Sequence, residues 1–139
     1  MATTRKASAV WNGSLMEGSG RVSLVSSNTG TFEVSWPARS AEPNGVTSPE
    51  ELLAAAHATC FSMALSHGLA KEGNPATELR TSAEVDFVPG TGITEIRLHV
   101  SGDVPGLDAA GFKTAAEAAK VGCPVSKALA AVPIILTVG

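Results

Sequence analysis

The two cysteines of the chain, Cys60 and Cys123, are the residues whose type bears most directly on chemistry. They lie far apart in the sequence, so neither a Cys-x-x-Cys redox motif nor a zinc-ribbon spacing applies. If the fold brings them together, one thiolate can attack and become a sulfenic acid, and the second thiol can then condense with it to a disulfide. Such chemistry would need no bound cofactor.

Cys60 lies in the stretch SPEELLAAAHATCFSMALS, residues 48–66, which has the pattern of a helix. On that helix it shares a mainly apolar face with Leu53, Ala56, Met63, Ala64 and His67. We expect this face to be buried. Judged by itself, Cys60 is therefore better interpreted as a small core residue than as a reactive thiol.

Cys123 stands between one predicted helix and the first turn of the next, in the sequence Gly122–Cys123–Pro124. Its sulfur could lie at a helix N-cap, where backbone N–H groups favour a thiolate. Local physics alone thus selects Cys123 as the more acidic thiol. The alternative is a turn residue with no chemical role.

Two glutamates at the start of the residue 48–66 helix differ in their availability. Ser48 and Glu51 have the spacing of a capping box, which would occupy Glu51. Glu50 is then the freer carboxylate, but it precedes Cys60 by a helix rise of about 15 Å. A role beside the thiol would require a bridging cation, a bent helix or a second copy of the chain. The alternative is an acid that favours the helix dipole.

One arginine and two histidines complete the candidate residues. Arg39 lies in a predicted surface loop, residues 37–47, and could hold a carboxylate and stabilise a thiolate together; an ordinary surface arginine is the alternative. His57 and His67 could act as general bases, or join both cysteines in a metal-binding module. HATC places His57 and Cys60 at the one-turn spacing of a metal pair, but no spacing supports Cys123 and His67 as further ligands, so ordinary helix histidines are the simpler interpretation.

The elements that must position these residues follow from hydrophobic periodicity and turn signals. Strands are predicted at Lys6–Trp11, Gly20–Ser26, Thr31–Trp36, Arg80–Val88, Thr94–Ser101 and Ile134–Val138. A long helix is predicted from Ser48 to a stop at Gly73, a second from an Asp108 cap to Val121, and a short third in CPVSKALAAV. Strands grouped in runs indicate an α+β fold.

Length and composition limit the possible functions. The 139 residues fit a single domain over 1–139, and 44% hydrophobic residues argue against disorder. A net charge of −3 with scattered cations offers no surface for nucleic acid or an anionic membrane. No segment reaches the apolar length of a signal peptide or a membrane helix, so we expect a cytoplasmic protein.

Two segments resemble the signature motifs of one known family. PEELLAAAHATCFSMALS and GCPVSKAL are similar to the two cysteine motifs of the OsmC/Ohr family, the osmotically inducible and organic hydroperoxide resistance proteins, and closer to the OsmC branch. VWNG, SWPARSAEPNG and VPGLDAAGF occur in the expected order around them. The resemblance implies an OsmC-like fold, with antiparallel sheets wrapped around central helices in an intertwined homodimer.

The same resemblance implies a thiol-dependent peroxidase that reduces organic hydroperoxides, and hydrogen peroxide less well, in oxidative or osmotic stress defence. Cys60 would be the attacking cysteine and Cys123 the resolving one, which reverses the local preference. Arg39, held by Glu50, would keep Cys60 ionised, and an external thiol or dithiol would reopen the disulfide without any cofactor or metal. Phe61 and Met63 are expected to line an apolar pocket with residues of a partner chain.

Two other functions stay open at this point. One is the metal-binding module, which bound zinc would reveal. The other is a non-enzymatic dimeric carrier of an apolar ligand, in which both thiols are incidental and replaceable.

Overall fold

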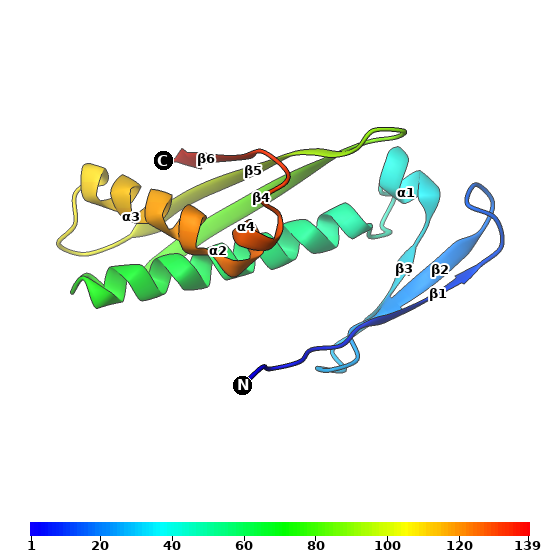
Figure 1. The fold of residues 1–139 in the computed structure, drawn as a ribbon, viewed down its shortest axis with the longest axis horizontal. Coiled ribbons are helices and arrows are strands. Elements are labelled where there is room, and N and C mark those ends of the chain that lie inside the picture. Colours follow the sequence, from blue (N-terminus) through cyan, green and yellow to red (C-terminus); the bar gives the residue numbers. More distant parts are fainter. The chain divides into compact units, whose positions relative to one another are not determined.

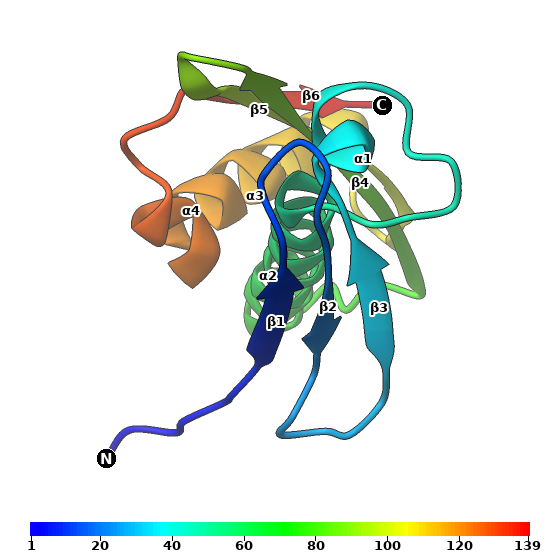
Figure 2. The same cartoon turned by 90° about the vertical axis from the view of Figure 1, so that its right-hand side faces the viewer.

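The computed structural model describes residues 1–139 as two compact units, Met1–Pro49 and Glu50–Gly139. The N-terminal unit contains an antiparallel three-stranded meander of β1 (Ser8–Asn12), β2 (Ser19–Ser23) and β3 (Thr31–Val34) (Figure 2). The three predicted N-terminal strands are thus confirmed in shortened form. The prediction of a single domain over residues 1–139 stays a prediction.

The segment after β3 was expected to be a loop, and this expectation is wrong for its first residues. Trp36–Ser40 forms a short helix, α1. Ser35 caps it, because its hydroxyl accepts a hydrogen bond from the backbone N–H of Ala38 at 3.3 Å. Pro37 occupies the first turn, where its missing N–H costs nothing. Arg39 therefore lies on a helix, in its last turn.

The C-terminal unit consists of one sheet and three helices that lie on the same side of it (Figures 1 and 2). In chain order its elements are α2 (Pro49–Lys71), β4 (Glu78–Val88), β5 (Gly92–Asp103), α3 (Ala109–Gly122), α4 (Pro124–Ala128) and β6 (Ile134–Val138). The strand order is β4-β5-β6. β4 and β5 form an antiparallel hairpin, but β6 pairs parallel to β5. The crossover through α3 and α4 returns the chain to the start of β5, so this sheet is not wholly antiparallel.

The core of this unit fixes which face of α2 is buried. His57, Phe61, Leu65 and Leu69 recur every four residues and are almost fully buried. Phe61, Leu65 and Leu69 pack with Leu98, Val100, Ala116, Ala119 and Cys123. The face expected to be buried is therefore wrong, because Met63 is 69% exposed and His67 is exposed. Cys60 lies at the edge of the true core face and packs against the cluster from there.

Helix α2 also has a clear end and an unusual length. Gly73 adopts φ +87°, and the backbone N–H of Asn74 donates to the carbonyl of Leu69 at 2.9 Å, which confirms the predicted stop. By length and hydropathy alone α2 could cross a membrane, contrary to the expectation from sequence. A core helix passes the same test, and α2 contributes buried side chains to the core of this unit.

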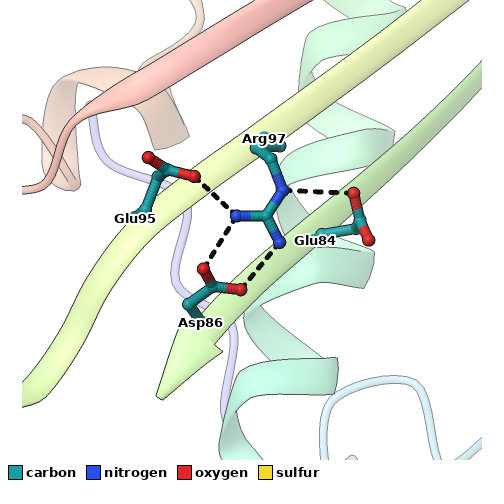
Figure 3. Close-up of polar contacts among 4 residues, drawn as sticks. All are labelled: Glu84, Asp86, Glu95 and Arg97. Carbon is teal, nitrogen blue, oxygen red and sulfur yellow. Dashed lines mark hydrogen bonds and ion pairs between the residues drawn. The ribbon is translucent and has the colours of Figure 1, made fainter. Parts of the chain in front are cut away.

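A charged network covers one face of the β4–β5 hairpin (Figure 3). Arg97 of β5 binds both carboxylate oxygens of Asp86 at 2.7 Å, and also contacts Glu84 and Glu95. Asp86 and Glu95 face each other across the strands, an unfavourable pairing of like charges that the guanidinium offsets. The network therefore favours the observed register of the hairpin that supports α2.

Candidate active site

The two cysteines come from opposite ends of the sequence of the C-terminal unit and meet in its interior. Cys60 lies in the middle of α2, and Cys123 forms both the end of α3 and the N-cap of α4. The backbone N–H of Cys123 donates to Ala119 at 2.8 Å, and its carbonyl accepts from Lys127 at 3.0 Å. Pro124 in the first turn forces the corner between the helices. Both thiols are reduced, and they lie close enough for each to shift the pKa of the other.

The two thiols differ in exposure. Cys123 has no exposed surface, whereas Cys60 is half-buried. A molecule that arrives from solvent therefore meets Cys60 first. Attack by Cys123 would require the α3–α4 corner to open.

The two thiols also differ in acidity, and the less exposed one, Cys123, is the more acidic. Burial raises the pKa of Cys60, and the neighbouring Cys123 raises it further. Burial also acts to raise the pKa of Cys123, but the backbone N–H of Ser126, the Cys60 thiol and the Ser126 side chain lower it overall. Within this chain the first proton thus leaves Cys123, as the local sequence argument expects. Activation of Cys60 requires a further positive group.

A second contact lies beside the thiol pair and was not foreseen from the sequence. His57 Nε2 and Ser126 Oγ are 2.7 Å apart, and both residues are buried. Burial lowers the pKa of His57, so the imidazole is neutral at physiological pH. The signal was present in the sequence, because HATC and CPVS each place a polar residue three positions from a cysteine.

Of the other predicted site residues, Glu50 lies away from the thiols of its own chain, and Arg39 belongs to the other compact unit. Glu50 is 6% exposed at the start of α2, and the unbroken helix separates it from Cys60 by a rise of about 15 Å. Arg39 is half-buried on α1, in the N-terminal unit. Phe61 has no exposed surface and packs in the core, so it cannot line a substrate pocket as expected.

The alternatives raised from the sequence find little support in the geometry. No group of three or more His, Cys, Asp or Glu side chains lies close enough together to hold a metal ion. A pocket of about 420 Å³ does exist between β5, α3 and β6, but neither cysteine is among its lining residues, which include Val104, Leu107, Phe112 and Val138.

Comparison with known proteins identifies close relatives along nearly the whole chain. Peroxiredoxin OsmC from Escherichia coli (strain K12) is 40% identical over 134 residues, which cover 94% of this chain and 93% of that protein. Peroxiredoxin OsmC from Shigella flexneri matches to the same extent.

Solved structures share the fold. An organic hydroperoxide resistance protein from Elizabethkingia anophelis is 26% identical with a TM-score of 0.73, and the match covers 100% of this chain and 99% of that chain. The corresponding protein OsmC from Legionella pneumophila, at 24% identity, has a TM-score of 0.76 over 99% of both chains and supports the fold. The family model described as OsmC-like protein matches residues 42–137, a range that holds both cysteines. The chain therefore belongs to the OsmC-like protein family.

Proposed function

We propose that the chain reduces organic hydroperoxides to alcohols through Cys60 and Cys123. The enzyme class rests on the relatives: 40% identity to Peroxiredoxin OsmC over 94% of the chain supports a cysteine-based peroxidase. The organic substrate class is suggested by the hydroperoxide resistance protein that shares the fold at 26% identity.

The observation that carries the proposal is the contact between a half-buried thiol and a fully buried one. The Cys60 thiolate attacks one peroxide oxygen, the O–O bond breaks, and the alkoxide leaves as alcohol after it takes up a proton. The resulting Cys60 sulfenic acid then condenses with the Cys123 thiol, and water leaves as the disulfide forms. A dithiol returns both cysteines to the reduced state, and no bound cofactor takes part.

Access decides between the two thiols in this proposal. Cys123 is the more acidic thiol in the isolated chain, but a buried thiolate does not meet a peroxide. Cys60 meets the peroxide and needs an activating cation, because its pKa is raised. We assign that role to Arg39, with Glu50 to orient its guanidinium, since arginine keeps its charge and can bind a carboxylate and a thiolate together.

The active form is proposed to be a homodimer. In the N-terminal unit only Gly20 and Ala38 are buried, and large apolar side chains such as Trp11 and Phe32 are more than two-fifths exposed. Helix α2 leaves Met63 69% exposed. A second copy of the chain would cover both surfaces, and it would let Glu50 or Arg39 of one chain serve the thiols of the other.

Peroxide consumption by the parent, Cys60→Ser and Cys123→Ser proteins with a dithiol reductant tests the proposal. The parent should consume cumene hydroperoxide faster than hydrogen peroxide, and Cys60→Ser should be inactive. Treated with cumene hydroperoxide in the absence of the dithiol, Cys123→Ser should accumulate a sulfenic acid at Cys60 that a dimedone-type probe labels. Turnover by Cys60→Ser at the parent rate would contradict the assignment.

A further inference from the structure

Two parallel contacts connect α2 to the start of α4. His57 and Cys60 stand three positions apart on α2, and Cys123 and Ser126 stand three positions apart at the α3–α4 corner. Residues at that spacing lie on one helix face. Cys60 therefore meets Cys123, and His57 meets Ser126 with Nε2 and Oγ 2.7 Å apart.

The His57–Ser126 contact is buried, so its polar atoms cannot hydrogen-bond to water instead. His57 has no exposed surface, and Ser126 is 5% exposed. His57 Nδ1 is buried with no hydrogen-bond partner. A buried polar atom left unpaired costs free energy, so the direction of the one imidazole N–H matters.

The neutral imidazole of His57 has two tautomers, and they differ in whether the Ser126 hydroxyl can donate a hydrogen bond to the Cys123 sulfur. If Nδ1 holds the proton, a buried donor is unmatched and the Ser126 hydroxyl must donate to Nε2. If Nε2 holds it, Nε2–H donates to Ser126 Oγ, and the Ser126 hydroxyl is free to donate to Cys123, whose pKa the Ser126 side chain lowers. When Cys123 is a thiolate, which only accepts hydrogen bonds, the second tautomer alone lets Ser126 contact both His57 and Cys123.

We propose that His57 and Ser126 are positioning residues which direct a proton at the Cys123 sulfur, so that Cys123 leaves as thiolate when the disulfide is reduced. The inference rests on the proposed peroxidase cycle and extends it to the step that recycles the enzyme. In this arrangement His57 Nε2–H donates to Ser126 Oγ, 2.7 Å away, and the Ser126 hydroxyl donates to Cys123, whose pKa Ser126 and Cys60 both lower.

The reduction step follows from this polarity. One thiolate of the dithiol attacks the Cys60 sulfur, the Cys60–Cys123 bond breaks, and its electron pair goes to Cys123. The second thiolate of the dithiol then attacks its own mixed disulfide and displaces Cys60. The dithiol is oxidised to a disulfide, and its two protons end on the two cysteines. The better-stabilised thiolate leaves faster, and the half-buried sulfur is the one that a reductant can reach.

The test starts from protein whose disulfide is made with diamide, so it does not depend on peroxidase activity. Dithiothreitol reduction should be several-fold slower in Ser126→Ala and His57→Phe than in the parent. Ser126→Thr keeps the hydroxyl and should retain the parent rate. Ser62→Ala is the matched control, because Ser62 is a partly buried serine of α2 whose hydroxyl binds Ala58 and Thr81.

Two further readouts separate positioning from a merely structural role. In a Cys60→Ser background, an ultraviolet thiolate titration should show a higher pKa for Cys123 after Ser126→Ala and no change after Ser62→Ala. A brief reaction of the oxidised parent with 2-mercaptoethanol should place the mixed disulfide on Cys60. A parent reduction rate and an unchanged titration in Ser126→Ala, or a mixed disulfide on Cys123, would overturn the inference. If the parent does not turn over peroxide but the reduction rates, the titration and the mixed disulfide are as expected, only the proposed function is contradicted.

Discussion

Alkylation of single-cysteine variants separates access from acidity, the two properties that select different thiols in this protein. Cys60→Ser leaves only Cys123, and Cys123→Ser leaves only Cys60. The acidity of the thiols would make Cys123 react faster, because its pKa is lowered while that of Cys60 is raised. Their exposure would make Cys60 react faster, because Cys123 has no exposed surface.

The size of the access effect can be worked out from the contacts that close the corner around Cys123. Exposure of its sulfur requires loss of the hydrogen bonds to Ala119 and from Lys127, and of the bond between His57 and Ser126. At about 1 kcal/mol each, opening costs roughly 3 kcal/mol. A tenfold rate change corresponds to about 1.4 kcal/mol, so Cys123 should react more than about a hundredfold slower than an open thiol.

Iodoacetamide labelling followed by intact mass gives both rates directly. At a pH near the ordinary thiol pKa, both proteins contain thiolate, and Cys123→Ser should be labelled much faster than Cys60→Ser. In concentrated urea the two rates should become similar, because the difference resides in the folded state. Native labelling of Cys123 at the rate of Cys60 would refute the claim that access selects the attacking thiol.

Three other predictions concern the structure around the site. Leu65→Ala should lower the free energy of unfolding by about 2–5 kcal/mol, because Leu65 has no exposed surface. Ser66→Ala, on the exposed side of the helix, should change the free energy of unfolding by no more than about 0.5 kcal/mol. Urea unfolding measures both changes. Burial lowers the pKa of His57, so as pH falls the unfolded chain binds a proton at this residue before the folded chain does. The stability of the fold should therefore decrease as pH drops below the ordinary histidine pKa, and His57→Phe should lack this part of the pH dependence of the urea midpoint. The same pH dependence in His57→Phe as in the parent would contradict this prediction. Arg97 lowers the pKa of Asp86, so the ionised pair stabilises the fold above the ordinary carboxyl pKa, and this contribution is lost as acid protonates Asp86. Arg97→Met should therefore lower the melting temperature at neutral pH and change it less in acid. Equal effects at both pH values would count against the ion pair.

Local signals in the sequence predicted the parts of the fold that local chemistry determines. Asp108 caps α3 through a hydrogen bond from the backbone N–H of Gly111 at 2.8 Å, as its position before an apolar run indicates. Cys123 is the N-cap of α4, and Gly73 ends α2 with a positive φ. Helix α1 was missed because two prolines suggested a loop, although Ser35 and Pro37 also fit a helix start.

Tertiary packing determined what the sequence left open. Periodicity placed Cys60 on an apolar face but could not tell which of two adjacent faces would meet the sheet, since α2 is rich in alanine all around. The contact between His57 and Ser126 joins residues far apart in the chain, so the fold was needed to show that the HATC and CPVS spacings face each other. The roles of Arg39 and Glu50 come from the family resemblance and stay predictions.

The mass change after one equivalent of organic hydroperoxide tests the central claim most directly. The reduced parent treated with cumene hydroperoxide should lose two hydrogens per chain, and peptide mapping should recover Cys60 linked to Cys123 within one chain. Cys60→Ser should keep its mass under the same treatment. An unchanged parent mass, a link between chains, or oxidation of Cys123 in Cys60→Ser at the parent rate would contradict the account.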